Sequence, residues 1–225
     1  MQLIVEILTM KTRTLSLLIL LIAGASCGQQ KDSENITTIM DNELNEKTGL
    51  ALATFGNGCF WCTEVIFQQL KGVSRVVSGY AGGKVKKPTY KEVCSGLTGH
   101  AEVIQLTYDP NQISFAELLE VFWQTHDPTT INRQGADVGT QYRSVVFYHN
   151  EEQKQLAETY KSKLNESGAF ENPVITEISP ISEYYPAEDH HQNYYNLNGS
   201  APYCSYVIQP KLDKFKKVFK AKLKG

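Results

Sequence analysis

The sequence is poor in cysteine, nearly balanced in charge and without an apolar run long enough to cross a bilayer. Five cysteines in 225 residues are too few for a small fold held together by disulfides. The 22 basic and 24 acidic side chains leave a formal net charge of −2, which gives no reason to expect nucleic acid as a partner. With 41% apolar and 20% charged residues, the composition is that of a globular protein and excludes collagen-like and wholly disordered chains.

An apolar run of eleven residues, 15–25, lies close to the N-terminus. A transmembrane helix needs about 20 apolar residues, so this run is too short to span a bilayer. Lys11 and Arg13 precede it and small residues follow it, which is the layout of a signal peptide. Met10 begins a more typical signal sequence than Met1 does, so we expect translation to begin at Met10.

The end of this run, Gly24-Ala25-Ser26-Cys27-Gly28, resembles the box at which bacterial lipoproteins are cleaved and lipidated, although Gly24 stands where leucine is usual. We therefore expect residues 1–26 to be a lipoprotein-type signal peptide and Cys27 to carry lipid. The protein would then be an exported, membrane-anchored lipoprotein of the cell envelope. The alternative is a cleaved secretory peptide in which Cys27 is incidental.

Residues 27–47 are polar and contain few large apolar side chains, which predicts a flexible tether. The remaining residues, 48–225, contain no internal repeat or low-complexity block and are long enough for one sizeable core. We expect them to form a single domain that acts as a monomer.

Hydrophobic patterns in this domain alternate between strand and helix periods. Strands are predicted over residues 50–55, 73–80, 102–108, 142–148 and 174–178, and helices over 63–70, 115–125, 151–165 and 210–223. Ser114 and Glu117 form a capping box before the second helix. We interpret the lysines of the last helix as a solvated face instead of a membrane or nucleic-acid patch. This order predicts an α+β fold: a two-layer sandwich of a mixed or antiparallel central sheet and flanking helices, with a ferredoxin-like plait as its core.

The segment Gly56-Asn57-Gly58-Cys59-Phe60-Trp61-Cys62 joins the first predicted strand to the first predicted helix. At a helix N-terminus, unpaired N–H groups and the helix dipole stabilise a thiolate, so we expect Cys59 to have a lowered pKa. Cys62 lies one helical turn further on the same face, from which the two thiols can form a disulfide. The two aromatic residues between them suit the wall of a pocket for a small apolar group.

The Cys59/Cys62 pair leaves two other interpretations open. Half of a zinc site would need two more ligands, and Cys94, Cys204 and the pair His190-His191 do not form a second Cys-x-x-Cys. A thioredoxin-like redox site has the same cysteine spacing, but it usually has Gly-Pro between the cysteines instead of Phe-Trp. We expect neither a metal nor a cofactor.

Seven segments of the chain resemble, in order and spacing, the signatures of the A-type peptide-methionine sulfoxide reductases, over roughly Leu50 to Phe219. They are Gly58-Cys59-Phe60-Trp61-Cys62, Gly79-Tyr80-Ala81-Gly82-Gly83, Pro88-Thr89-Tyr90, Gly99-His100-Ala101-Glu102, Asp109-Pro110, His126-Asp127-Pro128 and Gly139-Thr140-Gln141-Tyr142-Arg143-Ser144. The resemblance implies an oxidoreductase that reduces the S epimer of methionine sulfoxide, free or protein-bound, to methionine.

By this resemblance, Cys59 is the nucleophile that attacks the sulfoxide sulfur. Phe60 and Trp61 would hold the methyl group of the substrate. Glu102 would be the acid, since a carboxyl group buried beside aromatic rings has a raised pKa and carries a proton near neutral pH. The alternative for Glu102 is a salt bridge at a strand edge.

Three further residues match the family pattern around the sulfoxide oxygen. Tyr90 and Tyr142 match tyrosines that donate hydrogen bonds to this oxygen, for which an uncharged phenol is suited. Asp137 matches an acidic residue with a supporting electrostatic role. Judged singly, either tyrosine is more typical of a packed core.

The chain departs from many family members in its resolving cysteine, because no cysteine follows Cys204 and the segment continues into a predicted helix. We assign the resolving role to Cys62 and expect Cys204 and Cys94 to be inert buried thiols. Thioredoxin-like dithiols would reduce the Cys59–Cys62 disulfide. Two other functions remain: thiol–disulfide exchange on protein disulfides, and a lipid-anchored binding module with structural cysteines.

Overall fold

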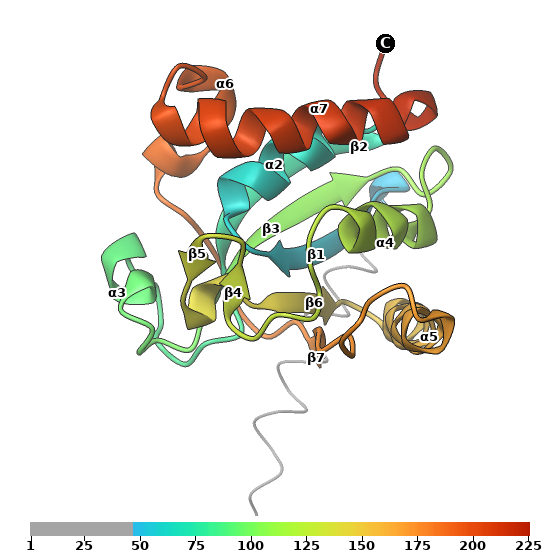
Figure 1. Ribbon diagram of the computed structural model, residues 1–225, viewed down its shortest axis with the longest axis horizontal. Coiled ribbons are helices and arrows are strands. Elements are labelled where there is room, and N and C mark those ends of the chain that lie inside the picture. The colour runs from blue at the N-terminus through green and yellow to red at the C-terminus, as the bar shows by residue number, and fades with distance from the viewer. Residues whose placement is uncertain (1–46) are drawn as a thin grey trace, which may run out of the picture.

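The computed structural model describes residues 47–225, and Figure 1 shows how their helices and strands are arranged. The predicted signal peptide 1–26, the predicted lipidation site Cys27 and all but the last residue of the predicted tether lie outside the described residues. Between residues 47 and 225, no helix is both long and apolar enough to cross a bilayer.

A six-stranded mixed sheet forms the centre of the molecule. Its strands are β1 (Ala51–Asn57), β2 (Val73–Ala81), β3 (Ala101–Tyr108), β6 (Ser144–Tyr148), β7 (Glu177–Pro180) and β8 (Tyr184–Pro186). They lie in the order β7-β6-β1-β3-β2-β8. Neighbours are antiparallel except for β6 and β7, which pair in parallel. Two short strands, β4 (Arg133–Gln134) and β5 (Asp137–Val138), form a separate antiparallel pair.

Helices pack against this sheet. They are α2 (Phe60–Gln68), α3 (Tyr90–Cys94), α4 (Phe115–Gln124), α5 (Glu151–Ser167), α6 (Tyr194–Leu197) and α7 (Gln209–Val218). A π-helical turn, Cys204–Ile208, leads directly into α7. In Figure 1, α7 runs alongside α2 above the sheet, and α5 lies below α4.

Aromatic rings fill the centre of the main core, which lies between the sheet and the helices. The ring of Phe55 in β1 lies 5.2 Å from that of Phe122 and 5.8 Å from that of Phe115, both in α4. It also lies 5.5 Å from the ring of Phe67 in α2. Buried side chains of α2, α4, α5 and α7 all belong to this cluster, which therefore holds the helices on the sheet.

A smaller cluster lies on the opposite face of the sheet. Its members are Ala81, Ala101, Val103, Val145, Phe147 and Ile181. Val103 belongs to this cluster while its neighbour Ile104 belongs to the main core. Successive side chains of a strand point to opposite faces, so the two clusters are separated by the sheet.

The mixed sheet with helices packed on it confirms the α+β class. The predicted capping box at the start of α4 is also present. The Ser114 hydroxyl accepts a hydrogen bond from the Glu117 amide at 3.2 Å, and the Glu117 carboxylate accepts one from the Ser114 amide at 2.9 Å. The short elements α3, α6, β4, β5 and β8 are absent from the prediction, because segments of so few residues carry too little periodic signal.

Several predicted boundaries differ from the structure: β6 begins at Ser144 instead of residue 142, α7 ends at Val218 instead of residue 223, and the starts of α2 and β7 each lie three residues from the prediction. Helix α2 begins at Phe60 instead of residue 63, because Cys59 is its N-cap residue. Strand β7 begins at Glu177 instead of residue 174, because the Ile175 amide donates to the Pro128 carbonyl oxygen outside the sheet.

Candidate active site

The turn between β1 and α2 brings Cys59 to the start of a helix. Gly58 has a φ of +100°, which few residues other than glycine adopt, and a Cβ atom there would lie 2.7 Å from Gln134 Cβ. The Cys59 carbonyl oxygen accepts hydrogen bonds from the amides of Cys62 and Thr63 at 3.1 and 3.3 Å. The predicted order of strand, glycine turn and helix is therefore present.

Cys59 lines a cavity of about 200 Å³. The side chains around it come from segments far apart in the sequence: Cys59, Phe60, Trp61, Tyr90, Glu102, Asp137, Tyr142 and Tyr203. The first seven of these are residues that the sequence predicts for the site, and the fold brings them together. Cys62 does not line the cavity and lies within α2, one turn after Cys59.

Glu102 of β3 lines the cavity as a buried carboxyl group, with 1% of its surface exposed. Its Oε2 atom accepts from the amide of Phe60 at 3.1 Å. Burial raises the pKa of Glu102 to about 8; the charges of Asp137 and Cys62 also raise it, and the Phe60 amide lowers it. At neutral pH this group is mostly protonated and can act as an acid. Since β3 lies inside the sheet between β1 and β2, a salt bridge at a strand edge does not apply.

Two short elements place Tyr90 and Tyr142 at the cavity. Tyr90 is the first residue of α3, whose first turn is closed by a capping box, and its amide donates to Glu188 Oε1 at 2.8 Å. Tyr142 is the last residue of a 3₁₀ turn that follows β5. Burial raises the pKa of both phenols, and the charge of Glu102 raises it further. Both tyrosines therefore remain hydrogen-bond donors over the physiological pH range.

Cys59 and Cys62 are both free and buried. The Cys59 and Cys62 thiols are close enough to change each other's pKa, so the two groups titrate as a pair. Burial raises the pKa of Cys59, and the charges of Cys62 and Glu102 raise it further. The neighbouring Cys59 thiol lowers the pKa of Cys62. The expectation of a lowered Cys59 pKa is wrong, because the loss of solvent around the sulfur outweighs its place at a helix terminus.

Comparison with known proteins assigns this site to a family. The family model of peptide methionine sulfoxide reductases matches residues 51–223. The chain belongs to this family. The match covers nearly all of the described residues, so the resemblance seen in the sequence is confirmed, and the protein is an enzyme of the oxidoreductase class.

Relatives of the reductase match it across the whole domain. A peptide methionine sulfoxide reductase MsrA of Leptospira borgpetersenii serovar Hardjo-bovis is 53% identical over 174 residues, which cover 77% of this chain and 98% of that protein. Another, from Trichodesmium erythraeum, is 55% identical over 164 residues, 73% of this chain and 93% of that protein. The solved structure of Mxr1 from Saccharomyces cerevisiae in reduced form is 37% identical, with a TM-score of 0.64, and the match covers 69% of this chain and 89% of that one.

Tyr203 is the residue of the reductase's cavity that the sequence does not single out. Its hydroxyl donates to Asp137 Oδ2 at 2.7 Å, and its ring meets Trp61 edge-on at a centroid distance of 5.9 Å. The hydroxyl also lies close enough to the Cys59 thiol to lower the pKa of Cys59. The signal in the sequence is weak, because Tyr203 precedes Cys204 in a run that looks like packed core and reaches the site only through long-range folding.

Two further aromatic residues, which do not line the cavity, pack against the rings that do. Trp61 stacks on Tyr194 with ring centroids 3.7 Å apart and planes 9° apart. The ring of His191 lies 4.4 Å from that of Tyr90 and 5.4 Å from that of Phe60. The sequence suggests His191 only as a zinc-ligand candidate, whereas in the structure its ring packs into the wall. Across residues 47–225, no group of three or more His, Cys, Asp or Glu side chains is placed to hold a metal ion.

The other two described cysteines of the reductase have different surroundings. Cys204 is fully buried in the main core, as expected. Cys94 is exposed at the end of α3, so the expectation of a buried thiol is wrong at this position. The reason is that α3 is a five-residue surface helix in which only Val93 is buried.

Proposed function

We propose that this reductase converts the S epimer of methionine sulfoxide to methionine, with Cys59 as its nucleophile and Glu102 as its acid. The observation that carries the proposal is the Glu102 carboxyl group, which burial keeps protonated in a small aromatic cavity that also contains the Cys59 thiol. Reduction of a sulfoxide needs both a sulfur nucleophile and a proton donor for the departing oxygen. Thiol–disulfide exchange needs no such donor, so this pairing favours the reductase chemistry.

The cavity separates the two small groups on the substrate sulfur by polarity. The methyl group packs on Phe60 and Trp61, and the oxygen faces Glu102 and the two cavity tyrosines. The rest of the substrate extends out of the cavity opening. With the methyl group and the oxygen held in place, only one configuration at sulfur exposes the sulfur atom to attack by Cys59. By the family resemblance, this configuration is S.

In the first chemical step, the Cys59 sulfur attacks the sulfoxide sulfur while Glu102 donates its proton to the oxygen. The attack forms a bond between the two sulfurs. This bond and the substrate S–O bond then break as the hydroxyl transfers to Cys59, which is oxidised by two electrons to a sulfenic acid while the substrate sulfur is reduced by two electrons to the thioether. The thiol proton of Cys59 replaces the proton that Glu102 gave. The raised pKa of Cys59 is compatible with this scheme, because its proton is consumed in the same step.

In the second step, Cys62 attacks the sulfenic sulfur of Cys59, which releases water and forms the Cys59–Cys62 disulfide. The lowered pKa of Cys62 supports this role, since the thiolate is the attacking form. A thioredoxin-like dithiol then reduces the disulfide by exchange and is itself oxidised to a disulfide. No metal or organic cofactor takes part in these steps.

Protein-bound methionine sulfoxide is also a proposed substrate, and exposed apolar side chains beside the cavity support it. Val138 follows the cavity residue Asp137 and is 62% exposed. Tyr206 lies one turn after Tyr203 and is 83% exposed. Exposed apolar groups next to a site that admits only a side chain suit the flanking residues of a polypeptide.

We further propose that Cys27 carries lipid after removal of residues 1–26, which anchors the enzyme to a membrane of the cell envelope through the tether 27–47. The sequence of the segment supports this proposal. Mass spectrometry of the mature N-terminus tests it. A lipidated Cys27 is expected, and an unmodified Cys27 or retained residues before it would reject the anchor.

A ferredoxin-like plait is our interpretation of the core. The strand order β6-β1-β3-β2, with α2 between β1 and β2 and α4 between β3 and β6, supports it. Superposition of these six elements on ferredoxin-like domains tests the interpretation, and a different path of α4 across the sheet would reject it.

The stereochemical proposal is tested with the two separated epimers of free methionine sulfoxide and dithiothreitol as reductant. Chiral separation of the remaining substrate is expected to show consumption of the S epimer and persistence of the R epimer. Equal rates on both epimers would reject the proposed binding geometry. Reduction of a protein disulfide without turnover of either epimer would favour the exchange function.

A further inference from the structure

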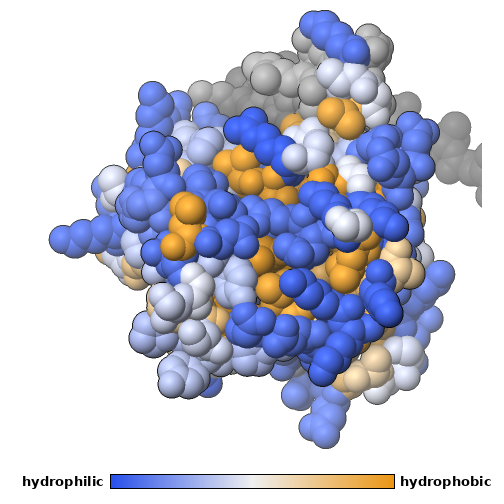
Figure 2. Space-filling model, turned by 90° about the horizontal axis from the view of Figure 1, so that it is seen from above, coloured by the Kyte–Doolittle hydropathy of each residue, from blue (hydrophilic) through white to orange (hydrophobic). Residues whose placement is uncertain are grey.

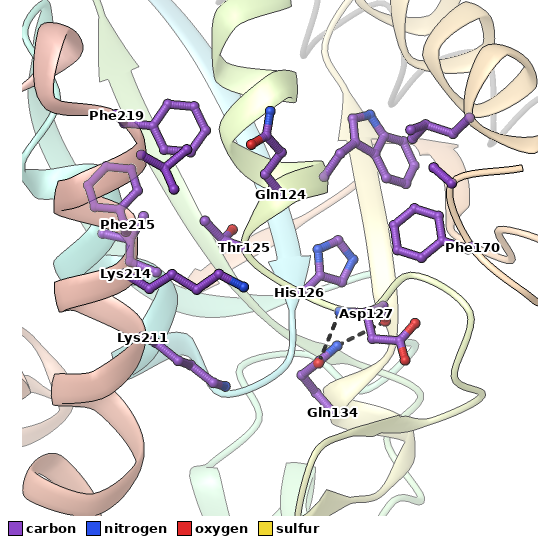
Figure 3. Close-up of a pocket in the computed structure, with 15 residues that line it drawn as sticks. Gln124, Thr125, His126, Asp127, Gln134, Phe170, Lys211, Lys214, Phe215 and Phe219 are labelled. Carbon is purple, nitrogen blue, oxygen red and sulfur yellow. Dashed lines mark hydrogen bonds between the residues drawn. The ribbon is translucent and has the colours of Figure 1, made fainter. Parts of the chain in front are cut away.

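A second cavity, of about 550 Å³, lies between α7 and the C-terminal end of α4 (Figure 3). Its volume is in the range of sites that bind small molecules, roughly 300–1,000 Å³. It shares no lining residue with the active-site cavity. The reaction described above does not use it.

The lining of this second cavity is apolar in one part and cationic in another. Phe215 of α7 and Phe219, the residue after this helix, face Phe170 across it (Figure 3). The side chains of Lys211 and Lys214 extend from the same helix over the cavity (Figure 3). None of the ion pairs formed within residues 47–225 involves either lysine. Both ammonium groups are therefore available to a ligand.

Several other polar groups of the second cavity are buried or already bonded within the protein. Trp123 lines it with 3% of its surface exposed, and its buried indole Nε1 has no hydrogen-bond partner among the described residues. The carboxylate of Asp127 already accepts from the amide and hydroxyl of Thr129 at 2.9 and 2.6 Å. Both ends of the Gln134 side chain bond to the Asp127 backbone, at 3.1 and 3.0 Å. The two lysine ammonium groups are therefore the cavity's unpaired charges that face a ligand, and they fit an anionic head group.

We propose that the second cavity binds a single-chain anionic amphiphile, a free carboxylate with an apolar tail of the fatty-acid type. The carboxylate would lie on Lys211 and Lys214, and the tail against the aromatic rings. Figure 2 views the molecule from the side of α7 and shows a mostly polar surface with apolar side chains in the gaps. Because Phe215 and Phe219 line the cavity with only 2% and 5% of their surface exposed, this apolar lining suits a single tail and not a flat membrane.

Isothermal titration calorimetry with laurate below its micelle concentration tests the proposal on the purified enzyme. One laurate is expected to bind per protein, and dodecyltrimethylammonium, with the same tail and an opposite charge, is expected not to bind. The double variant Lys211→Gln/Lys214→Gln is expected to weaken laurate binding roughly fivefold or more. The control Lys216→Gln/Lys217→Gln removes the same charge from exposed positions of α7 that do not line the cavity, and should leave the affinity unchanged.

A cavity-filling variant, Ala169→Trp, gives a second test that does not depend on charge. Ala169 is exposed and lines the cavity, so the variant is expected to keep the wild-type melting temperature and lose laurate binding. Three results would overturn the proposal: no laurate binding by the wild type, an equal loss in both lysine double variants, or lysine-dependent binding to phosphatidylglycerol vesicles without binding of monomeric laurate.

Discussion

The candidate active-site cavity and the lysine-lined cavity differ in size and in chemistry, and we propose the smaller one as the reactive one. The cavity of about 550 Å³ is lined by aromatic rings and lysines and contains no thiol. The cavity of about 200 Å³ contains a thiol, two carboxyl groups and three phenols. A reactive site is therefore indicated by titratable groups whose pKa is shifted by burial. The volume of a cavity indicates only the size of the ligand that it can hold.

Burial acts in opposite directions on one titratable group of each cavity. It raises the pKa of Glu102 to about 8, so this carboxyl group keeps a proton that it can transfer. It lowers the pKa of His126 to about 4, so this imidazole stays neutral. Both ring nitrogens of His126 are already hydrogen-bonded, to Phe122 O and Ser144 Oγ, each at 2.7 Å. The first group is placed for reaction, and the second is a fixed part of the scaffold.

The largest expected effect is the loss of all activity in Cys59→Ser. A serine hydroxyl stays protonated near neutral pH and is a poor nucleophile for the sulfoxide sulfur. Methionine formation in a single-turnover assay with pre-reduced enzyme should fall to the background level. Methionine formation at the wild-type rate by this variant would remove Cys59 from the mechanism.

The companion variant Cys62→Ser should complete one turnover and then stop with thioredoxin as reductant. A sulfenic acid should accumulate on Cys59, where dimedone traps it for mass spectrometry. The control Cys204→Ser should keep thioredoxin-supported turnover, apart from a loss of stability from its buried position. If Cys204→Ser stops recycling while Cys62→Ser does not, Cys204 is the resolving cysteine and our assignment is wrong.

Glu102→Gln is expected to lower the single-turnover rate by roughly 10²- to 10³-fold, since an amide cannot transfer a proton. The wild-type rate should fall as the pH rises through about 8, because ionisation of Glu102 removes the acid. The rate of Glu102→Gln should not decrease over this pH range. The rate of Glu64→Gln, which changes another buried carboxyl group outside the cavity, should decrease as in the wild type. A wild-type rate that is flat across this range would contradict the assignment.

His126 is expected to make stability depend on pH without affecting the chemistry. Its folded pKa of about 4 lies below the ordinary value of 6.5, so the unfolded chain takes up the proton first. The stability contributed by the neutral imidazole is therefore present above 6.5 and lost as the pH falls toward 4, by at most about 3 kcal/mol. The free energy of unfolding, measured with urea at several pH values, should depend less steeply on pH in His126→Gln than in the wild type. In the exposed control His190→Gln, its dependence on pH should be unchanged.

Tyr203→Phe should give the smallest effect, a fall in kcat/KM of roughly tenfold. The variant keeps the ring against Trp61 and removes the hydroxyl that donates to Asp137 and influences the titration of Cys59. The control Tyr160→Phe on α5 removes a hydroxyl far from the cavity and should leave kcat/KM unchanged. Equal activity of both variants with free methionine sulfoxide would reduce Tyr203 to a packing residue.

Those features of the fold and of the site that are formed by residues close together in the sequence could be predicted from the sequence. The glycine turn before Cys59 and the capping box at Ser114 are encoded within a few residues, and both are present. Glu102 follows from family resemblance, and its raised pKa follows from burial. Tyr203 and the direction of the Cys59 pKa depend on contacts between distant segments, which no local pattern reports. The prediction that Cys94 is buried is wrong for a similar reason: it lies in a short surface helix, which exposes a residue type that is usually buried.

The proposed role of Glu102 as the acid depends on its pKa in the folded, reduced enzyme. Carbon-13 NMR of the enzyme labelled at its glutamate carboxyl carbons, with Glu102→Gln used to assign the resonance, follows this group through a pH titration. We predict a midpoint near 8, which leaves the carboxyl group mostly protonated at neutral pH. A midpoint at the ordinary glutamate value, about 4.3, would contradict it, because Glu102 would then be a carboxylate with no proton to donate.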